Sequence, residues 1–364
     1  MRCTMNIMPI SLLGLIGFFA GCSSTHLNYR RPQMTADEIR RYYDYPHVPI
    51  QATIVGKEKT KQYTHQLVEF ELQLPADMDR ASIDEARRQV AATTDESRIR
   101  NYSLEYMVRF DYFRPNTAER HPLVMVSPIL GGNTIFAEDF CRYFATHGFC
   151  AALVHRRRNN VKPEEGLEKV ERELRKSVLR IRQALDWASE QPEVDSSRVG
   201  SFGISYGAII NTVAAGAEPR IKYHVLALGG GDLPNIIVST TEPQIRRQVS
   251  KVARARGWNH DQLLAELQRV IKSDPLNSAP LLDPRNVLMV VAQFDVVVGT
   301  QYENLLWRRI GKPRRIVVPL GHATTALALP FVKGEALRFL QTKFGVQPVE
   351  GSQADFAIHS SKRF

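Results

Sequence analysis

The sequence predicts an α/β protein with a mostly parallel central sheet, helices on both faces and a helical cap insertion. After residue 120, short apolar runs alternate with longer amphipathic segments, which is the pattern of repeated strand–helix units. Before that point, the alternating segments 66–74 and 104–113 predict antiparallel strands that begin the sheet. A basic helical stretch at 242–272 falls between two late apolar runs, so we expect the cap at about 233–275.

The composition is that of a folded globular protein. The chain has 364 residues, of which 43% are hydrophobic and 24% charged, enough for one large domain. We place this domain at residues 51–344 and a polar C-terminal tail at 345–364. The formal net charge of +10 favours acidic surfaces such as anionic lipid head groups or polysaccharide. The chain lacks zinc-finger spacing and any interleaving of basic with aromatic residues, so we expect no nucleic-acid partner.

The first 21 residues have the features of a secretory signal peptide. Arg2 supplies a positive charge, an apolar stretch runs over residues 7–20, and Cys22 follows. The apolar stretch is short for a transmembrane helix. The four residues that end at Cys22 resemble the lipobox of bacterial lipoproteins, which implies that Cys22 is acylated. A plain signal peptide or a buried cysteine is the alternative interpretation.

The segment after Cys22 is polar and contains a dense cluster of arginine and tyrosine between residues 29 and 45. We interpret residues 22–50 as a tether that then packs along the domain. Ser23 resembles the residue found after the cysteine in lipoproteins sorted to an outer membrane. The sequence therefore predicts a protein of the bacterial cell envelope, anchored by lipid and facing the periplasm.

The first half of the domain alternates between expected helices and strands. Besides the two early strands, we expect a helix at 77–92, a buried strand at 121–129, a helix at 136–147 and a strand at 149–154. Cys141 and Cys150 fall on that last helix and strand. They could pair in an oxidising compartment, and two buried free thiols are the alternative. No C-x-x-C pair is present, so we expect no thiol metal site.

A loop that opens with three arginines follows the strand at 149–154. These residues, 156–158, leave the carboxyl end of a strand, where they could meet an anionic substrate group or could simply be solvated. The segment 165–190 has an apolar stripe at helical spacing, which predicts a long amphipathic helix with a solvated charged face.

The stretch Arg198–Ala208 is the most informative part of the sequence. An apolar run, 199–204, ends at Ser205, and Gly203 and Gly207 flank the serine. This is the G-x-S-x-G pattern of a nucleophile elbow, in which the chain turns sharply from strand into helix. Larger side chains two positions before and after the serine would collide in that turn. The small apolar residues that follow Gly207 suit a buried helix.

The last third of the chain repeats the strand–helix pattern. We expect strands at 223–228, 286–293 and 313–320, and helices at 300–310 and 324–344. The cap segment 242–272 divides into two helices at Gly257-Trp258-Asn259. Its positive charges either form a solvated face or lie against an anionic membrane. They are Arg246, Arg247, Lys251, Arg254 and Arg256.

Three candidate catalytic residues each follow an apolar strand. Ser205, Asp295 and His322 come in this order along the chain, and parallel strands place their carboxyl ends on one edge of a sheet. Asp232, at the end of the preceding strand, is the rival acid. A serine hydroxyl needs a base within hydrogen-bond reach, and histidine can both accept and return the proton. We interpret the other histidines, such as His155, as structural.

From residue 66 to 344 the chain resembles the α/β-hydrolase superfamily. The run from Val194 to Gly207 resembles the dienelactone hydrolase and prolyl oligopeptidase-like branches. The resemblance implies that Ser205 is the nucleophile, His322 the general base and then acid, and Asp295 the residue that orients the imidazole. It also implies an oxyanion hole built from two backbone N–H groups.

The first oxyanion donor is expected from Tyr206, which follows the nucleophile. The second is expected from the loop after the strand at 121–129. Pro128 has no N–H and cannot serve, so we favour Leu130, with Gly131 as the alternative. No metal or organic cofactor is implied.

These residues together predict a lipid-anchored serine hydrolase, most simply a carboxylesterase that acts on a small-molecule ester or acyl substrate through an acyl-enzyme. A peptidase or a thioesterase of the same fold is the alternative enzyme. A non-catalytic envelope protein that keeps the fold and binds a partner is the alternative of a different class. The intact serine, aspartate and histidine set argues against this last interpretation.

Overall fold

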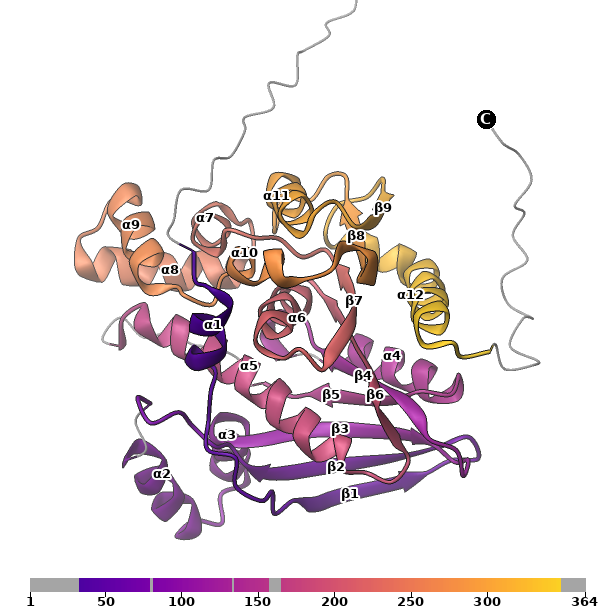
Figure 1. Cartoon of the computed structure of the whole chain (residues 1–364). Coiled ribbons are helices and arrows are strands. Elements are labelled where there is room, and N and C mark those ends of the chain that lie inside the picture. Colours follow the sequence, from indigo (N-terminus) through magenta and orange to yellow (C-terminus); the bar gives the residue numbers. More distant parts are fainter. Residues whose placement is uncertain (1–32, 79–80, 133, 157–164, 348–364) are drawn as a thin grey trace, which may run out of the picture. The chain divides into compact units, whose positions relative to one another are not determined.

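The computed structural model describes residues 33–78, 81–132, 134–156 and 165–347 of the chain (Figure 1). The expected signal segment 1–21, the expected acylation site Cys22 and most of the polar tail lie outside the described residues. In the described part of the chain, no helix is long and apolar enough to cross a membrane.

A nine-stranded sheet organises the chain, with the strand order β1-β2-β3-β5-β4-β6-β7-β8-β9. The pairs from β1 through β3 to β5 are antiparallel, and all pairs from β5 to β9 are parallel. The parallel strands therefore present their carboxyl ends along one edge, as the sequence predicts. The strands are β1 (Thr53–Lys59), β2 (Tyr63–Glu71), β3 (Met107–Pro115), β4 (His121–Ser127), β5 (Cys150–Val154), β6 (Val194–Ile204), β7 (Ile221–Ala227), β8 (Val287–Ala292) and β9 (Arg314–Val318).

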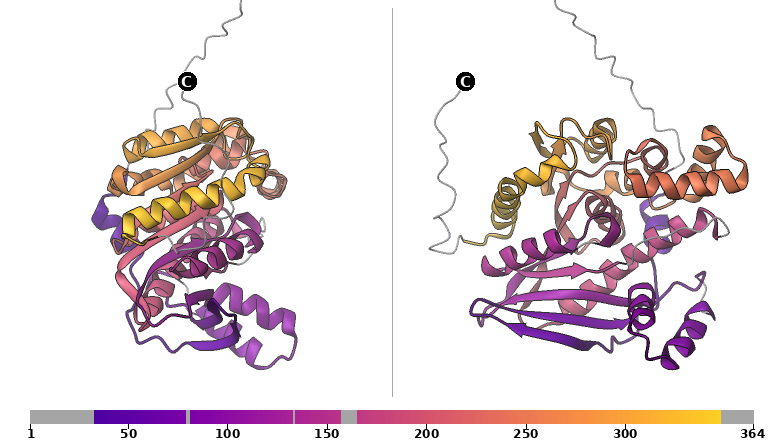
Figure 2. Two further views of the ribbon diagram at one scale, coloured as in Figure 1. Left: turned by 90° about the vertical axis from the view of Figure 1, so that its right-hand side faces the viewer. Right: turned by 180° about the vertical axis from the view of Figure 1, so that it is seen from behind.

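Helices cover both faces of the sheet. Figure 1 shows α5 in front of the strands, and the reverse view in Figure 2 shows α4 on the other face. The helices are α1 (Ala36–Tyr42), α2 (Ala81–Ala91), α3 (Glu96–Tyr106), α4 (Ile135–Thr146), α5 (Glu168–Ser189), α6 (Tyr206–Ala217), α7 (Leu233–Ser239), α8 (Pro243–Arg256), α9 (His260–Val270), α10 (Pro275–Ser278), α11 (Thr300–Ile310) and α12 (Leu329–Phe344). Short 3-10 turns occur at η1 (Leu130–Gly132), η3 (Ala279–Leu281), η4 (Pro284–Asn286) and η5 (Thr324–Ala328).

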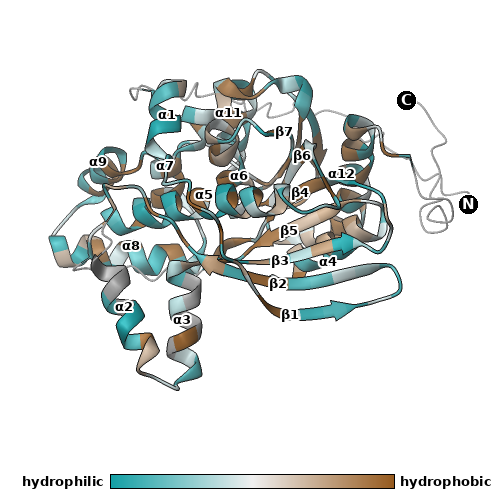
Figure 3. Cartoon of the chain, turned by 60° about the horizontal axis from the view of Figure 1, so that its bottom comes forward, coloured by the Kyte–Doolittle hydropathy of each residue, from teal (hydrophilic) through white to brown (hydrophobic). Residues whose placement is uncertain are grey.

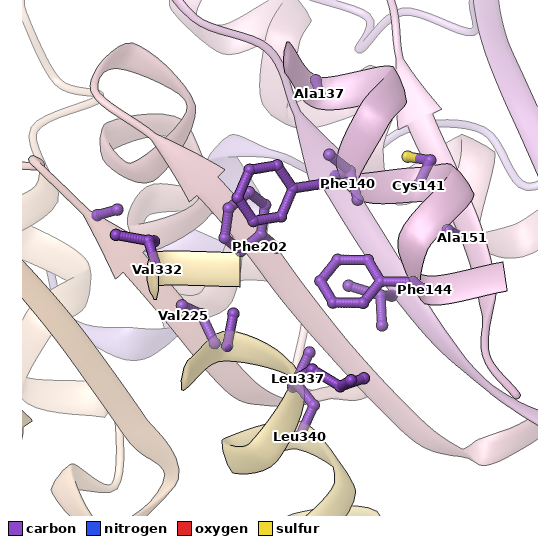
Figure 4. Close-up of a cluster of buried hydrophobic side chains, with 14 of the residues drawn as sticks. Ala137, Phe140, Cys141, Phe144, Ala151, Phe202, Val225, Val332, Leu337 and Leu340 are labelled. Carbon is purple, nitrogen blue, oxygen red and sulfur yellow. The ribbon is translucent and has the colours of Figure 1, made fainter. Parts of the chain in front are cut away.

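A hydrophobic core lies between the sheet and the face covered by α4 and α12 (Figure 4). Phe140 and Phe144 of α4 pack against Phe202 of β6, and the Phe140 and Phe202 rings stack with centroids 4.1 Å apart. Leu337 and Leu340 of α12 belong to the same cluster. This packing holds β6, and with it the turn at Ser205, against a rigid layer of aromatic side chains.

The antiparallel start of the sheet differs from the expectation in two places. The segment predicted as one strand, 104–113, is helical up to Tyr106 and becomes a strand only at Met107. Charged and polar residues interrupt the apolar pattern of α3, so its helical period is hidden. β1 was not expected, because all seven of its residues are exposed and show no apolar face.

The β1–β2 hairpin forms one edge of the sheet. Figure 3 shows hydrophilic residues along much of this hairpin and hydrophobic residues on the inner strands. β1 carries three charged side chains, Lys57, Glu58 and Lys59, which discourage pairing with another chain. The central strand β4 is buried at all seven positions.

Residues 33–50, the described part of the expected tether, pack on the domain. α1 begins at a capping box in which Thr35 and Glu38 exchange hydrogen bonds. The Tyr43 hydroxyl donates to Ser273 Oγ at 2.7 Å, so α1 is fixed beside the end of the cap segment.

Cys141 and Cys150 are both buried and both free. Burial raises the pKa of each thiol, and that of Cys150 reaches about 12. The two sulfurs are therefore neutral packing groups. Of the two expectations for these cysteines, the structure shows the pair of buried free thiols and not the disulfide.

Candidate active site

Ser205 lies in a sharp turn between β6 and α6. Its backbone has φ 57° and ψ −119°, a conformation that a non-glycine residue rarely adopts. The Ser205 N–H donates to the Ala227 carbonyl of the neighbouring strand at 2.7 Å, which secures the turn. The serine side chain is thereby held at the carboxyl edge of the sheet.

The two flanking glycines are required by crowding in this turn. A Cβ at Gly203 would lie 2.4 Å from the Gly207 carbonyl carbon. A Cβ at Gly207 would lie 2.3 Å from the Ser127 carbonyl oxygen of β4. Both contacts involve backbone atoms, so no side-chain movement can relieve them. The elbow predicted from the glycine spacing is therefore present for the expected steric reason.

His322 and Asp295 reach the same edge because β8 and β9 continue to pair beyond their ends. The Phe294 N–H donates to the Leu320 carbonyl at 3.0 Å. The two segments that lead to Asp295 and to His322 therefore lie side by side. The loop after β9 is closed by Thr325 Oγ1, which donates to the Gly321 carbonyl at 2.8 Å. These contacts fix the backbone on both sides of the imidazole.

The three expected side chains meet in one hydrogen-bonded row. His322 Nε2 is 2.9 Å from Ser205 Oγ, and His322 Nδ1 is 2.6 Å from Asp295 Oδ2. Chemistry assigns the protons: Nδ1–H donates to the carboxylate, which leaves Nε2 free to accept from the serine hydroxyl. The His322 side chain is 15% exposed and that of Asp295 is fully buried.

The surroundings of Asp295 keep its carboxyl group ionised. Burial alone would raise its pKa, but the hydrogen bond from His322 and the backbone N–H groups of Val298 and Val297 lower the pKa below its ordinary value. Oδ1 accepts from the N–H groups of Val297 at 2.8 Å and Val298 at 2.9 Å. One carboxylate oxygen is thus fixed by backbone while the other faces the imidazole.

The rival acid Asp232 has a different environment. It has left-handed backbone angles, and its Oδ2 accepts from the Asn235 side-chain amide at 2.7 Å. Its backbone N–H donates to Asp274 Oδ1 at 3.1 Å. The His322 imidazole donates its hydrogen bond to Asp295, so the geometry separates the two candidates.

Both backbone groups expected for an oxyanion hole border the same cavity as Ser205. Tyr206 begins α6, and an N–H in the first turn of a helix has no acceptor within that helix. Leu130 begins the 3-10 turn η1, in which Gly131 and Gly132 both have positive φ. The Gly132 N–H donates to the Ile129 carbonyl within this loop at 3.3 Å, so Leu130 and Gly131 are the two positions left for the second donor.

The cavity beside Ser205 has a volume of about 540 Å³ and a mostly aliphatic wall. It extends from the strand ends to α5 on one side and to the cap helices α7 and α8 on the other. Arg156 and Glu242 are the charged side chains among the described residues that line it, apart from the His322 imidazole. Apolar wall residues include Leu167, Leu174, Ile209, Ile236, Val249 and Val252.

Three other histidines of the described chain fill structural positions. His224 is fully buried beside Ser201 Oγ, and burial lowers its pKa to about 4, so it is neutral. His155 Nε2 lies 2.6 Å from Asp111 Oδ2, and His65 Nε2 lies 2.7 Å from the other oxygen of the same carboxylate. The pairing of Asp111 between two histidines was not expected, because these residues lie on separate strands. In the described part of the chain, no cluster of His, Cys, Asp and Glu side chains is arranged to hold a metal ion.

Sequence reasoning also missed Glu303, a buried carboxyl group on α11 near Asp295. Burial first, and then the negative charge of Asp295, raise the pKa of Glu303 to about 9. Glu303 therefore carries a proton at neutral pH, while Asp295 carries the negative charge. No local sequence pattern marks this residue, since only the fold brings α11 against the end of β8.

Replacing Glu303 by glutamine is expected to stabilise the protein at alkaline pH. The folded state keeps the proton up to pH about 9, whereas the unfolded state releases it near 4.5, so the free energy of unfolding falls as pH rises between these values. Glutamine removes this loss, which predicts a gain of about 5 kcal/mol at pH 8 and less than about 1 kcal/mol at pH 5. Urea unfolding at both pH values measures the difference. The exposed Glu58→Gln variant serves as the control, and an equal effect of Glu303→Gln at both pH values would contradict the assigned protonation.

Comparison with known proteins gives a family match and a set of similar folds. The family model described as X-Pro dipeptidyl-peptidase (S15 family) matches residues 80–264. No curated protein matches the chain.

Two of the similar solved structures are acetyl xylan esterases. That of Paenibacillus sp. R4 has a TM-score of 0.61 and 15% sequence identity, and covers 86% of this chain and 96% of its own. Acetyl xylan esterase 1 of Thermoanaerobacterium sp. JW/SL YS485 has a TM-score of 0.58 and 16% identity, with 84% and 94% covered. A puromycin-hydrolysing peptidase of Mycobacterium tuberculosis has a TM-score of 0.50 and 17% identity, with 66% and 38% covered. At these identities the likeness concerns the fold.

Proposed function

The chain belongs to the S15 peptidase family within the α/β-hydrolase superfamily, and from this membership we propose that it is a serine hydrolase, with an apolar cavity that makes it specific for carboxylic esters. The observation that carries the proposal is the row formed by Ser205, His322 and Asp295 at the mouth of an apolar cavity. The order and geometry of these side chains suit acyl transfer to a serine.

In the proposed first step, His322 Nε2 removes the proton of the Ser205 hydroxyl while Oγ attacks the ester carbonyl carbon. The carbonyl oxygen becomes an oxyanion, which the N–H groups of Tyr206 and Leu130 stabilise. Asp295 holds the imidazole in the required tautomer and stabilises its positive charge. The tetrahedral intermediate collapses, and His322 returns the proton to the leaving alcohol, so that the acyl group remains on Ser205.

In the second step, water replaces the alcohol. His322 removes a proton from the water, whose oxygen attacks the acyl carbon, and Ser205 leaves with that proton. The products are a carboxylic acid and the free enzyme. No other chemical group is required, because hydrolysis of an ester is neither oxidation nor reduction.

The Arg156 side of the cavity favours an ester over the N-terminal part of a peptide. An enzyme that releases dipeptides from a peptide N-terminus must accommodate a substrate ammonium group, which carboxylates stabilise. The wall carries the Arg156 guanidinium, which repels an ammonium group. The carboxylate of Glu242 already accepts a hydrogen bond from the Gln244 N–H at the start of α8.

A substrate panel tests this proposal against the two alternative activities. We expect kcat/KM for p-nitrophenyl butyrate to exceed that for glycyl-prolyl-p-nitroanilide by at least about 100-fold, because the wall favours neutral acyl groups. Butyryl thiocholine tests the thioesterase alternative in the same assay. A preference for the prolyl anilide would contradict ester specificity, and absence of turnover on all three substrates would favour a non-catalytic protein.

We also propose that the protein is anchored in a bacterial envelope through acylated Cys22. The support comes from the lipobox-like sequence and from the surface of the domain. The exposed side of α8 carries Arg246, Arg247, Lys251, Arg254 and Arg256, which suits an anionic lipid surface. Large apolar side chains are exposed beside the strand ends that carry the site, among them Ile135, Phe294, Val296 and Leu327.

Metabolic labelling of the full chain with an alkyne analogue of palmitate tests the anchor. Labelling of the wild-type chain that is lost in Cys22→Ser supports it. Equal labelling of both chains, or labelling of neither, contradicts acylation at Cys22. Membrane fractionation of the same two chains shows whether the acyl group determines where the protein resides.

A further inference from the structure

Arg156 stands out among the buried arginines because two of its guanidinium nitrogens have no hydrogen-bond partner in the described chain. It follows β5, is only 7% exposed and lines the cavity beside Ser205. Its Nε and Nη2 atoms are buried without a hydrogen-bond partner. The sequence left open whether this residue meets an anionic group, and the burial now separates it from an ordinary solvated arginine.

The other buried arginines of the same region are satisfied. Arg175 forms two hydrogen bonds with the Asp77 carboxylate, at 2.7 and 2.9 Å. Arg180 donates to the backbone carbonyls of Met107 and Glu105 at 3.2 and 2.6 Å. A buried guanidinium without such partners is costly, since it has lost its water and gained no hydrogen bonds. Because the Arg156 guanidinium lies in the wall of a cavity, a ligand bound there can supply the missing hydrogen-bond acceptor.

The side chain is fixed in a definite orientation. Its guanidinium carbon lies 4.0 Å from the centroid of the Tyr206 ring, and stacking on an aromatic face sets the plane of the group. Nε and one terminal nitrogen of a guanidinium form a fork that matches the two oxygens of a carboxylate. The two unpartnered nitrogens of Arg156 are of these kinds, and because both are enclosed in this structure, a carboxylate reaches them only when the surrounding side chains move apart.

Arg156 also lies next to the groups expected to carry the reaction. Tyr206 directly follows Ser205, and a Cβ at Gly132 of the oxyanion loop would lie 2.8 Å from the Arg156 carbonyl oxygen. The guanidinium therefore borders the nucleophile turn, and the Arg156 backbone borders the loop that holds Leu130. A carboxylate bound to it would belong to the same substrate molecule whose ester carbonyl faces Ser205.

We propose that Arg156 is a specificity residue that binds a carboxylate of the substrate, so that the natural substrate is an ester carrying an apolar segment and one acidic group. This inference rests on the proposed ester hydrolysis and names its substrate class. The aliphatic wall holds the apolar segment, and the single cationic side chain of the described wall selects the acid.

Two isosteric esters measure this selectivity. Mono-p-nitrophenyl glutarate ends in a carboxylate, and p-nitrophenyl 5-methylhexanoate replaces that carboxylate by an isopropyl group of the same shape. The measured quantity is kcat/KM for the acidic ester divided by kcat/KM for the neutral ester. We expect Arg156→Met to lower this ratio by about 30-fold, because the charged hydrogen bonds to the substrate carboxylate are lost. Arg156→Lys keeps the charge and is expected to retain part of the ratio. The exposed Arg308→Met on α11 is the matched control and should leave the ratio unchanged.

Binding without turnover gives a second readout. With both proteins in the Ser205→Ala background, calorimetric titration with monomethyl glutarate should show binding that weakens when Arg156→Met is added, whereas dimethyl glutarate should not distinguish the two proteins. Thermal unfolding checks that the variant is folded, and if it is not, the comparison of wild type with Arg156→Lys carries the test. An unchanged ratio together with unchanged monomethyl glutarate binding would overturn the proposal. Selective carboxylate binding without ester turnover would instead refute the proposed function and leave the role of Arg156 as an anion site supported.

Discussion

Replacing Ser205 by alanine is expected to lower kcat for ester hydrolysis by about 10⁶-fold, the scale seen when the nucleophile of a serine–histidine–aspartate set is removed. The reason is that Oγ is the atom that attacks the carbonyl, and no other hydroxyl lies within hydrogen-bond distance of His322 Nε2 in the described chain. The residual rate comes from the oxyanion donors and from binding alone. Steady-state assays with p-nitrophenyl butyrate, corrected for spontaneous hydrolysis, measure the loss.

The exposed Ser239→Ala variant on α7 is a suitable control for this measurement, because the same hydroxyl is removed outside the hydrogen-bonded row. It should retain full activity. Circular dichroism and thermal unfolding should be alike for wild type and Ser205→Ala, since alanine occupies the same backbone turn. A Ser205→Ala enzyme with more than about a tenth of wild-type activity would mean that another residue is the nucleophile.

Replacing Asp295 by asparagine is expected to lower kcat by about 10⁴-fold. Asparagine has nearly the shape of aspartate and can still accept the N–H groups of Val297 and Val298. Its amide has no negative charge, however, and if its NH₂ group faces Nδ1 it favours the tautomer in which Nε2 carries the proton. His322 then cannot accept the proton of the serine, and the imidazolium loses its counter-charge.

Asp232→Asn separates this effect from a general effect of removing a buried acid near the site. Because Asp232 accepts from Asn235 and is not hydrogen-bonded to His322, its substitution should lower kcat by less than about 10-fold. Comparison of kcat for the two variants at pH 8 decides between them. A large loss for Asp232→Asn together with a small one for Asp295→Asn would reverse the assignment of the acid.

Local sequence predicted the parts of the molecule that depend on local sterics. The elbow could be predicted because Gly203 and Gly207 occupy positions where a Cβ would meet backbone atoms. The convergence of Ser205, Asp295 and His322 followed from parallel strand ends, and the cap break at Gly257 followed from a glycine with left-handed angles. These features need only the chain near each residue and the general geometry of a parallel sheet.

The features that could not be predicted depend on tertiary environment. β1 is exposed throughout and forms only because β2 offers an edge, so no apolar pattern marks it. The raised pKa of Glu303 arises from burial and from Asp295, which becomes its neighbour only in the fold. Arg156 differs from the satisfied Arg175 by the absence of a partner such as Asp77, which a sequence cannot show.

The most direct measurement of the central claim is covalent labelling of the full chain with a fluorophosphonate, followed by intact-mass and peptide analysis. An activated serine attacks the phosphorus and expels fluoride, which leaves a stable adduct on the nucleophile. We predict one adduct per chain, located on Ser205, lost in Ser205→Ala and formed far more slowly in Asp295→Asn. A folded protein that takes up no label, or that takes it up on another residue with Ser205 unmodified, would contradict the assignment of this chain as a hydrolase acting through Ser205.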